Sequence, residues 1–440
     1  MTKCSRRQFI STAGAVTAST LLAHGCSLGN SATVSPSRLT VHVNAADAPE
    51  VNAARLGYIP LTDAAPLIIA KEKGFFKQYG MVNVEIVKHS SWDDVQSNLA
   101  WGSQAGGTDG AHLLSPMPYL MYSGKTSLRE RIPLYILARL NVNGQGISLA
   151  NIYQNLDVGL QSSRLREVVD KAKAIGPGMH LKMGVTFPGG THDLWMRYWL
   201  ASGNIHPDTD VAMFTVPPLQ MVANIKTGTM NGFCVGEPWN AQLLRKNIGY
   251  SALTTGELWQ DHPEKAFAMR MDWVDRYPKA TKAILRAIQQ AQQWCDKLEN
   301  KAEMCRIIAA PQYLNVPVDD ILERAKGKFM LGNNHQFENS SYRMKFWVNH
   351  ASYPYKSHDI WFLTENIRWG YLPADTDMIA LVNAINREDL WREAAKASAQ
   401  PSVIPKSTSR GIETFFDGRQ FNADNPTTYL NSLAIKKLQE

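Results

Sequence analysis

The chain is short of cysteine, of long uncharged runs and of enzyme signatures. Its 440 residues include five cysteines, none in a CxxC pair and none in a Cys/His spacing typical of a metal site. The sequence contains no HExxH, Walker or nucleophile-elbow motif, which argues against a zinc protease, an ATPase or an α/β-hydrolase. The 44% of hydrophobic residues is ordinary for a globular chain long enough for two or three domains.

The only long uncharged run near the start, residues 9–25, follows a basic patch formed by Lys3, Arg6 and Arg7. This order is typical of an export signal and not of a transmembrane helix. Residues 5–10, Ser-Arg-Arg-Gln-Phe-Ile, resemble the twin-arginine pattern, which is read by a translocase that accepts folded cargo. We therefore expect residues 1–25 to be a signal peptide of the twin-arginine type.

A candidate lipid-attachment residue ends this region. The run Leu-Ala-His-Gly-Cys, which ends at Cys26, resembles a lipoprotein cleavage box. We expect Cys26 to carry lipid and residues 26–54, which are polar and small, to form the anchor and tether. Cleavage by the ordinary signal peptidase is the alternative. The expected location is the outer, periplasmic face of the inner or plasma membrane.

The net charge is modest once the leader is removed. It falls from +7 to +4, because the leader contains three basic residues and no acidic one. A small positive charge is compatible with gathering anions. It is not concentrated enough to suggest nucleic-acid binding, which would require a basic face with interleaved aromatics.

Two of the remaining cysteines lie on consecutive predicted helices, at residues 278–298 and 302–309. Cys295 shares an apolar stripe with Ile284 and Ile288, which predicts a core position. In an oxidising compartment a disulfide between Cys295 and Cys305 could link the two helices. Two separately buried thiols are the alternative and the more common outcome.

Short strands alternate with helices along the first half of the chain. This alternation predicts parallel βαβ units and an α/β fold with helices on both faces of each sheet. Breaks near residues 141–146 and 255 suggest two crossings between lobes, with a ligand cleft at the carboxyl ends of two sheets. The expected division is residues 55–142 in lobe 1, 143–254 in lobe 2, and 255–440 in the second part of lobe 1 with an aromatic C-terminal extension wrapped on that lobe.

Within the predicted second lobe, residues 181–195 read as a strand, a glycine loop and the start of a helix. Gly189 and Gly190 let the backbone approach a ligand closely, and Thr191 is expected to be the N-cap. A helix start offers unpaired N–H groups and partial positive charge to a small anion, and His192 would add a side-chain donor. The alternative is an ordinary βα turn with a surface histidine.

Several longer motifs carry a resemblance to a known family. The chain resembles the solute-binding proteins of the nitrate, sulfonate and taurine transport class. More narrowly, it resembles the cyanobacterial-type nitrate/nitrite-binding lipoproteins, with the bicarbonate-binding lipoproteins as near relatives. The similarity covers residues 55 to 437. It is carried by AAPLIIAKEKGFF at 64–76, NVNGQG at 141–146, TFPGGTHD at 186–193, DHPEKAF at 261–267, YPYKSHD at 353–359 and SRGIETFF at 409–416.

This resemblance implies a fold, partners and a binding site. The implied fold is the two-lobed type II clamp of periplasmic solute-binding proteins, each lobe a mixed, mostly parallel sheet flanked by helices. The implied partners are the permease and ATPase subunits of an ABC-type importer. The anion site carried over from the family motifs would comprise Trp92, Gln145, Gly190, His192 and Lys265, with Pro218 and Val235 as apolar walls.

The chemistry of these residues favours nitrate or nitrite over bicarbonate. Nitrate has no proton to donate, so each polar neighbour should be a donor, and Gln145, His192 and Lys265 can all donate. Bicarbonate carries a hydroxyl that must find an acceptor, and the bicarbonate-binding relatives have an acid in place of Lys265 and a glutamine in place of His192. We expect neither a metal nor another cofactor.

The sequence is compatible with other functions. Some clamp-fold proteins are enzymes that make a thiamine precursor, but these would be expected to lack an export leader and to contain a cysteine-rich segment. We therefore expect a protein that is not an enzyme. A bicarbonate-, cyanate- or sulfonate-binding protein, or a sensor that reports a bound anion to a membrane partner, would use the same clamp.

Overall fold

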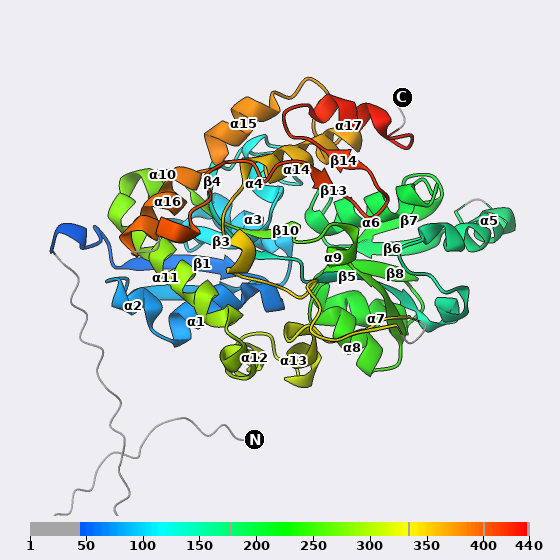
Figure 1. Cartoon of the computed structure of the whole chain (residues 1–440), viewed down its shortest axis with the longest axis horizontal. Helices are drawn as coiled ribbons and strands as arrows, with labels where there is room; N and C mark the ends of the chain where they lie inside the picture. The colour runs from blue at the N-terminus through cyan, green and yellow to red at the C-terminus, as the bar shows by residue number, and fades with distance from the viewer. Residues whose placement is uncertain (1–44, 177, 333–334, 399–400, 438–440) are drawn as a thin grey trace, which may run out of the picture. The chain divides into compact units, whose positions relative to one another are not determined.

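In the computed structural model, the described residues are 45–440 without 177, 333–334, 399–400 and 438–440 (Figure 1). The predicted signal peptide, Cys26 and most of the predicted tether lie outside these residues. Strands in the described part form two five-stranded sheets and two short two-stranded ones. No helix within the described ranges is both long and apolar enough to cross a membrane.

The first sheet combines the beginning of the chain with one later strand. Its order is β2-β1-β3-β10-β4. β1 pairs in parallel with β2 and β3, whereas β10 pairs antiparallel with β3 and β4, so four of the five strands run in one direction. The bounds are β1 Ala53–Tyr58, β2 Asn83–Lys88, β3 Gly110–Leu114, β4 Leu134–Val142 and β10 Pro263–Arg270.

The second sheet repeats this plan with the intervening residues. Its order is β7-β6-β8-β5-β9, with β6 parallel to β7 and β8, and β5 antiparallel to β8 and β9. Each sheet is therefore mixed and mostly parallel, as expected. The bounds are β5 Gln145–Ala150, β6 Leu181–Val185, β7 Val211–Thr215, β8 Gly232–Gly236 and β9 Gly249–Thr254.

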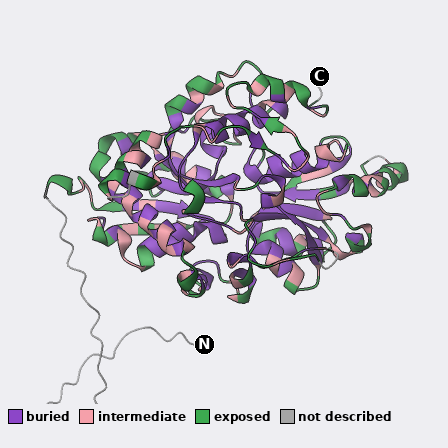
Figure 2. Ribbon diagram, viewed as in Figure 1, coloured by how far each residue is buried: buried purple, intermediate pink, exposed green. Residues whose placement is uncertain are grey.

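Most strands of both sheets are buried because helices cover their faces, whereas the edge strands β2 and β7 are partly exposed (Figure 2). Helices over the first sheet include the long α11, which packs against α1, α2 and α16, and helices over the second include α6 and α8. The helix bounds are α1 Ala65–Glu72, α2 Phe75–Gln78, α3 Trp92–Trp101, α4 Met117–Tyr122, α5 Arg166–Ile175, α6 Thr191–Ser202, α7 Met221–Lys226, α8 Trp239–Arg245, α9 Thr255–Leu258, α10 Met271–Arg276, α11 Pro278–Asp296, α12 Lys301–Ala309, α13 Asp319–Ala325, α14 Lys356–Arg368, α15 Met378–Ile385, α16 Glu388–Ala397 and α17 Pro426–Ser432.

Two breaks in regular structure and two buried cysteines mark the chain locally. Gly74, with a left-handed φ of 72°, separates α1 from α2. Residues 151–156 form a 3-10 helix (Asn151–Leu156), and Asp157 follows in a left-handed conformation. Cys295 and Cys305 are free, buried thiols, which is the commoner of the two outcomes considered, and burial raises the pKa of both.

The aromatic C-terminal segment, residues 352–362, is core, and it contacts helices and strands of both sheets and not only the first one. On one side, the Asp359 carboxylate of α14 pairs with the Arg139 guanidinium of β4. On the other, Trp361 stacks on Trp195 of α6, with ring centroids 4.9 Å apart and planes 20° apart. The segment therefore bridges the two sheets and is not confined to the first one.

Two buried histidines beside this aromatic segment predict acid-sensitive stability. Burial lowers the pKa of His262 to about 3 and that of His358 to about 4. Both rings are neutral in the folded protein at pH 5, whereas in the unfolded chain they titrate near 6.5 and take up protons. The free energy of unfolding should therefore fall between pH 7 and pH 5, by up to about 2 kcal/mol for each ring.

Denaturant unfolding at the two pH values measures this loss. The fall should be smaller in His262→Asn and unchanged in His350→Asn, because His350 is exposed. Equal stability of the wild-type protein at pH 5 and pH 7 would contradict the prediction.

Candidate functional site

A candidate site lies at the carboxyl ends of the parallel strands, and both sheets present such an edge. β1, β3 and β4 end at this edge of the first sheet, and the antiparallel β10 begins there. In the second sheet β6, β8 and β9 end at the corresponding edge, and β5 begins there. The carboxyl ends of strands in open α/β sheets are the usual place for ligands.

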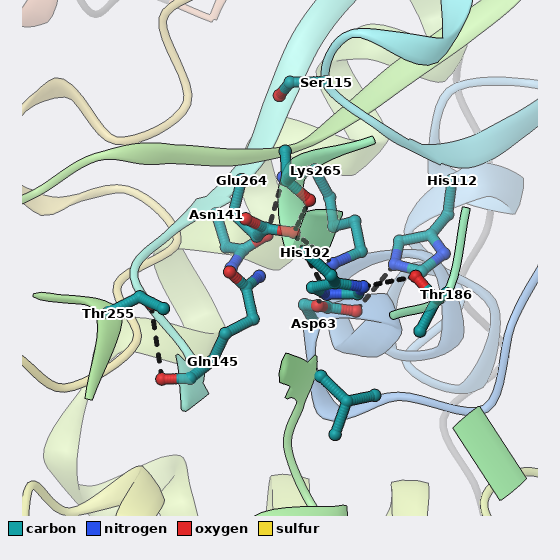
Figure 3. Close-up of polar contacts among 12 residues, drawn as sticks. Asp63, His112, Ser115, Asn141, Gln145, Thr186, His192, Thr255, Glu264 and Lys265 are labelled. Carbon is teal, nitrogen blue, oxygen red and sulfur yellow. Dashed lines mark hydrogen bonds and ion pairs between the residues drawn. The ribbon is translucent and has the colours of Figure 1, made fainter. Parts of the chain in front are cut away.

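The centre of the site is Lys265 at the beginning of β10. Its side chain is fully buried, and Nζ lies 2.8 Å from Asp63 Oδ2 and 2.6 Å from Glu264 Oε1 (Figure 3). Burial alone would lower the pKa of the Lys265 ammonium, but the two carboxyl groups raise it. Nζ also lies 5.9 Å from the centre of the Trp92 ring. The site therefore contains a permanent cation.

A strand irregularity brings Glu264 and Lys265 together. In a regular strand, neighbouring side chains point to opposite faces. The β10–β4 register shifts between Pro263 and Lys265 and again between Lys265 and Ala266. Such bulges re-aim side chains and often lie beside functional sites.

Asp63 follows β1 in a short 3-10 helix, Thr62–Ala64, and holds two partners. Its Oδ1 lies 2.6 Å from His112 Nε2, and its Oδ2 contacts Lys265. Burial alone would raise the pKa of Asp63, but the lysine and the histidine hold it well below its ordinary value. Burial lowers the pKa of His112. Asp63 is therefore an anchored carboxylate that fixes the position of Lys265.

Glu264 is a carboxyl group with one satisfied and one free oxygen. Oε1 accepts hydrogen bonds from Lys265 Nζ and, at 2.6 Å, from Thr191 Oγ1 of α6. Oε2 is buried and has no hydrogen-bond partner among the described residues. Burial raises the pKa of Glu264 despite the adjacent lysine. The contact with Thr191 also joins β10 of the first sheet to α6 beside the second.

His192 is the second residue of α6 and faces this group from the second sheet. Its Nδ1 hydrogen-bonds with Thr186 Oγ1, and its Nε2 lies 3.6 Å from Glu264 Oε1, without a hydrogen-bond partner in the described residues. Burial lowers the pKa of His192 well below its ordinary value, so the ring is neutral. The helix N-cap is Gly190, not Thr191 as expected, because the Thr191 hydroxyl is used on Glu264.

Gln145 begins β5 with its side chain buried. Neither its amide nitrogen nor its amide oxygen has a hydrogen-bond partner within the described ranges. The same is true of the indole Nε1 of Trp92, which begins α3 after β2. Buried polar atoms are rarely left without a partner, so several of them around one cation indicate a site for a small polar ligand.

The structure constrains Gly190 more closely than the two predicted apolar walls, Val235 and Pro218. A Cβ at Gly190 would lie 2.6 Å from Leu114 Cδ1 and 3.1 Å from Phe187 O, so either the Leu114 side chain or the loop would have to shift to make room for a side chain. Val235 is buried on β8, directly opposite Gly146 of β5. Pro218 is buried at the start of a 3-10 helix, and its role as a wall stays a prediction.

Sequence reasoning missed Asp63, His112 and Glu264. A buried ammonium needs counter-charges, and the two carboxyl groups supply them. That the ligand itself meets only donors stays a prediction. Glu264 lies next to Lys265 within a motif already singled out, and this adjacency was the available signal. The sequence contained no comparable signal for Asp63 or His112.

A substitution of His192 separates binding from stability. His192→Gln should weaken binding of the anion about tenfold, because a donor is displaced from the site, while the free energy of unfolding of the ligand-free protein changes by less than about 1 kcal/mol. Calorimetric titration and denaturant unfolding measure the two effects. A large loss of stability with unchanged affinity would indicate a structural role instead.

A model of the NMT1-like family matches residues 47–309. The chain is 58% identical to the nitrate/nitrite binding protein NrtA of Nostoc sp. over 447 aligned residues, which cover 100% of each chain. It is 40% identical to the bicarbonate-binding protein CmpA of Synechococcus elongatus, with 98% of each covered. It is also 33% identical to the nitrate import ATP-binding protein NrtC of Synechocystis, over 87% of this chain and 55% of that protein.

A solved structure agrees with the fold. The crystal structure of the periplasmic nitrate-binding protein NrtA from Synechocystis superposes with a TM-score of 0.86 at 57% identity, and the match covers 88% of this chain and 100% of that chain.

Proposed function

The chain belongs to the NMT1-like family, and we propose that it is the nitrate- and nitrite-binding component of an ABC-type importer, which delivers the anion to the membrane permease. The observation that carries this proposal is the buried ammonium of Lys265 beside polar atoms without partners. The protein is not an enzyme: the full-length relatives at 40% identity or above are binding proteins.

The proposed ligand-binding residues are Trp92, Gln145, Gly190, His192 and Lys265. The Lys265 ammonium supplies the charge, and the amide of Gln145 and the neutral ring of His192 each supply an N–H group. The indole N–H of Trp92 is a further donor. Nitrate is planar and accepts hydrogen bonds around its whole edge, so donors arriving from both sheets suit it.

The energetics are compatible with tight binding. Two or three charge-assisted hydrogen bonds contribute on the order of 1.5–3 kcal/mol each. Together with the attraction of the Lys265 ammonium, these bonds offset the cost of ordering the lobes. Because donors come from both sheets, the anion favours the closed arrangement, which the permease can then recognise.

Bicarbonate is the second candidate, and one observation favours it. The free Oε2 of Glu264, if ionised, would accept a hydrogen bond from the bicarbonate hydroxyl. The donors Gln145, His192 and Lys265 argue the other way, because nitrate can only accept hydrogen bonds and each of these side chains can donate one. Affinity for nitrate combined with weak binding of bicarbonate is therefore expected.

A thermal-shift screen with nitrate, nitrite, bicarbonate, cyanate and taurine tests the function. We expect nitrate and nitrite to raise the melting temperature in a concentration-dependent way, because a ligand that binds only the folded state stabilises it. A shift with bicarbonate or taurine, and none with nitrate, would reject the proposal.

The protein acts in the periplasm, and lipid anchoring through Cys26 is the further part of the proposal. Replacing Cys26 by serine should release the mature protein from the membrane fraction, because no helix of the described residues can span the membrane and a lipid on Cys26 would supply the attachment. Cell fractionation followed by immunoblotting measures this. Unchanged membrane association of Cys26→Ser would exclude the anchor.

A further inference from the structure

The binding site contains one more ionisable group than an anion site needs. Asp63, Glu264 and Lys265 are all fully buried and in mutual contact through the lysine. With both carboxyl groups ionised, the three together carry a charge of −1 before any ligand arrives. Adding nitrate would then place a second uncompensated negative charge in a medium of low dielectric constant, which is strongly unfavourable.

We infer that Glu264 takes up a proton when nitrate binds. The resulting carboxylic acid then holds the anion through a hydrogen bond donated by its Oε2. This inference rests on the proposed function, because it concerns the same ligand in the same site.

The geometry assigns the proton to Oε2. Oε1 already accepts hydrogen bonds from Lys265 and Thr191, so a proton there would displace one of them. Oε2 is buried without a partner in the part of the chain described here. An Oε2–H group in this position would be a donor, and nitrate can only accept. The protonated group therefore matches the ligand, whereas the ionised group would repel it.

Asp63 is a poorer candidate for the proton. Both of its oxygens face positive or donating groups, Lys265 on one side and His112 on the other, and its pKa is held low. Glu264 shares the lysine with Asp63 and gains only the Thr191 hydroxyl in addition, so burial dominates and raises its pKa.

The other ionisable groups around Glu264 do not compensate its charge. The imidazoles of His192 and His262 are neutral because burial lowers their pKa values, and the Cys234 thiol of β8 is neutral because burial raises its pKa. Arg139 of β4 forms an ion pair with Asp359. Asp193 of α6 forms a separate ion pair with Arg197.

The proton also bears on specificity. An ionised Glu264 would accept the hydroxyl of bicarbonate, whereas a protonated Glu264 offers a donor that nitrate and nitrite can use. The state of one carboxyl group would then discriminate between proton-free oxyanions and bicarbonate.

Calorimetric titration of the full mature protein with sodium nitrate from pH 6 to pH 10, in pairs of buffers with different ionisation enthalpies, tests the inference. The Kd should rise about tenfold per pH unit above the pKa of Glu264 in the ligand-free protein, with uptake of up to about one proton per nitrate. Glu264→Gln keeps a neutral donor, so it should bind nitrate with the same affinity at every pH and take up no proton.

The outcomes separate the two proposals. A pH-independent Kd without proton uptake in the wild-type protein would overturn the role of Glu264 and leave nitrate binding intact, and this measurement does not depend on any variant folding. The wild-type slope persisting in Glu264→Gln would also overturn it. Absence of nitrate binding at every pH would reject the proposed function itself.

Discussion

Replacing Lys265 by glutamate should abolish nitrate binding, with a loss of affinity of about a thousandfold or more. The substitution removes the cation of the site and adds a third carboxyl group beside Asp63 and Glu264. Loss of a charge-assisted hydrogen bond costs about 1.5–3 kcal/mol, and a buried unpaired charge costs more. Because each 1.4 kcal/mol is a factor of ten, about 4 kcal/mol corresponds to the expected loss.

Calorimetric titration at pH 7 measures this effect against a matched control. Lys226→Glu makes the same change of charge at the exposed end of α7, and its affinity should stay within about twofold of wild type, because exposed charges are screened. Near-ultraviolet circular dichroism shows whether Lys265→Glu retains its tertiary structure. Nitrate binding by a folded Lys265→Glu protein would show that the site is misplaced.

Removing the carboxylate of Asp359 should produce the largest loss of stability. Asp359 and Arg139 are both almost fully buried, and Asp359 also accepts a hydrogen bond of 2.7 Å from Asn386 Nδ2. Asp359→Ala would leave the Arg139 guanidinium buried without its counter-charge. Breaking a buried pair in this way costs about 3–5 kcal/mol, far more than the pair contributes relative to an apolar substitute.

The control for this prediction is the same substitution in an exposed pair. Asp389 pairs with Arg387, and the two side chains are 55% and 26% exposed. Asp389→Ala should change the free energy of unfolding by less than about 1 kcal/mol. Denaturant unfolding of the two variants measures the difference. Equal effects would mean that the buried pair does not hold the C-terminal segment against the first sheet.

The residues proposed for the site stand in local motifs of the sequence. Gly190 and His192 belong to a strand–loop–helix unit that can be read without any distant contact, and Lys265 lies in a motif of seven residues. What the motifs could not reveal was the set of partners. Asp63 and Lys265 are far apart along the chain, and only the pairing of β10 between β3 and β4 brings the lysine to the edge where β1 ends.

The position of Glu264 could not be predicted either, although it is the direct neighbour of Lys265. Strand periodicity places adjacent side chains on opposite faces, so it argues against the one signal available for Glu264, its adjacency to Lys265. The register shifts in β10 reverse that expectation. A bulge depends on how neighbouring strands pair, and this pairing is not encoded in the periodicity of one strand.

The sequence by itself determined the α/β class, the glycine loop that begins α6 and the presence of a lysine among donors, because these follow from local patterns of a few residues. Only the tertiary structure decided that the lysine is buried between two carboxyl groups and that the C-terminal segment spans both sheets. The physical reason is that burial and charge compensation depend on contacts between distant parts of the chain, which no local pattern specifies.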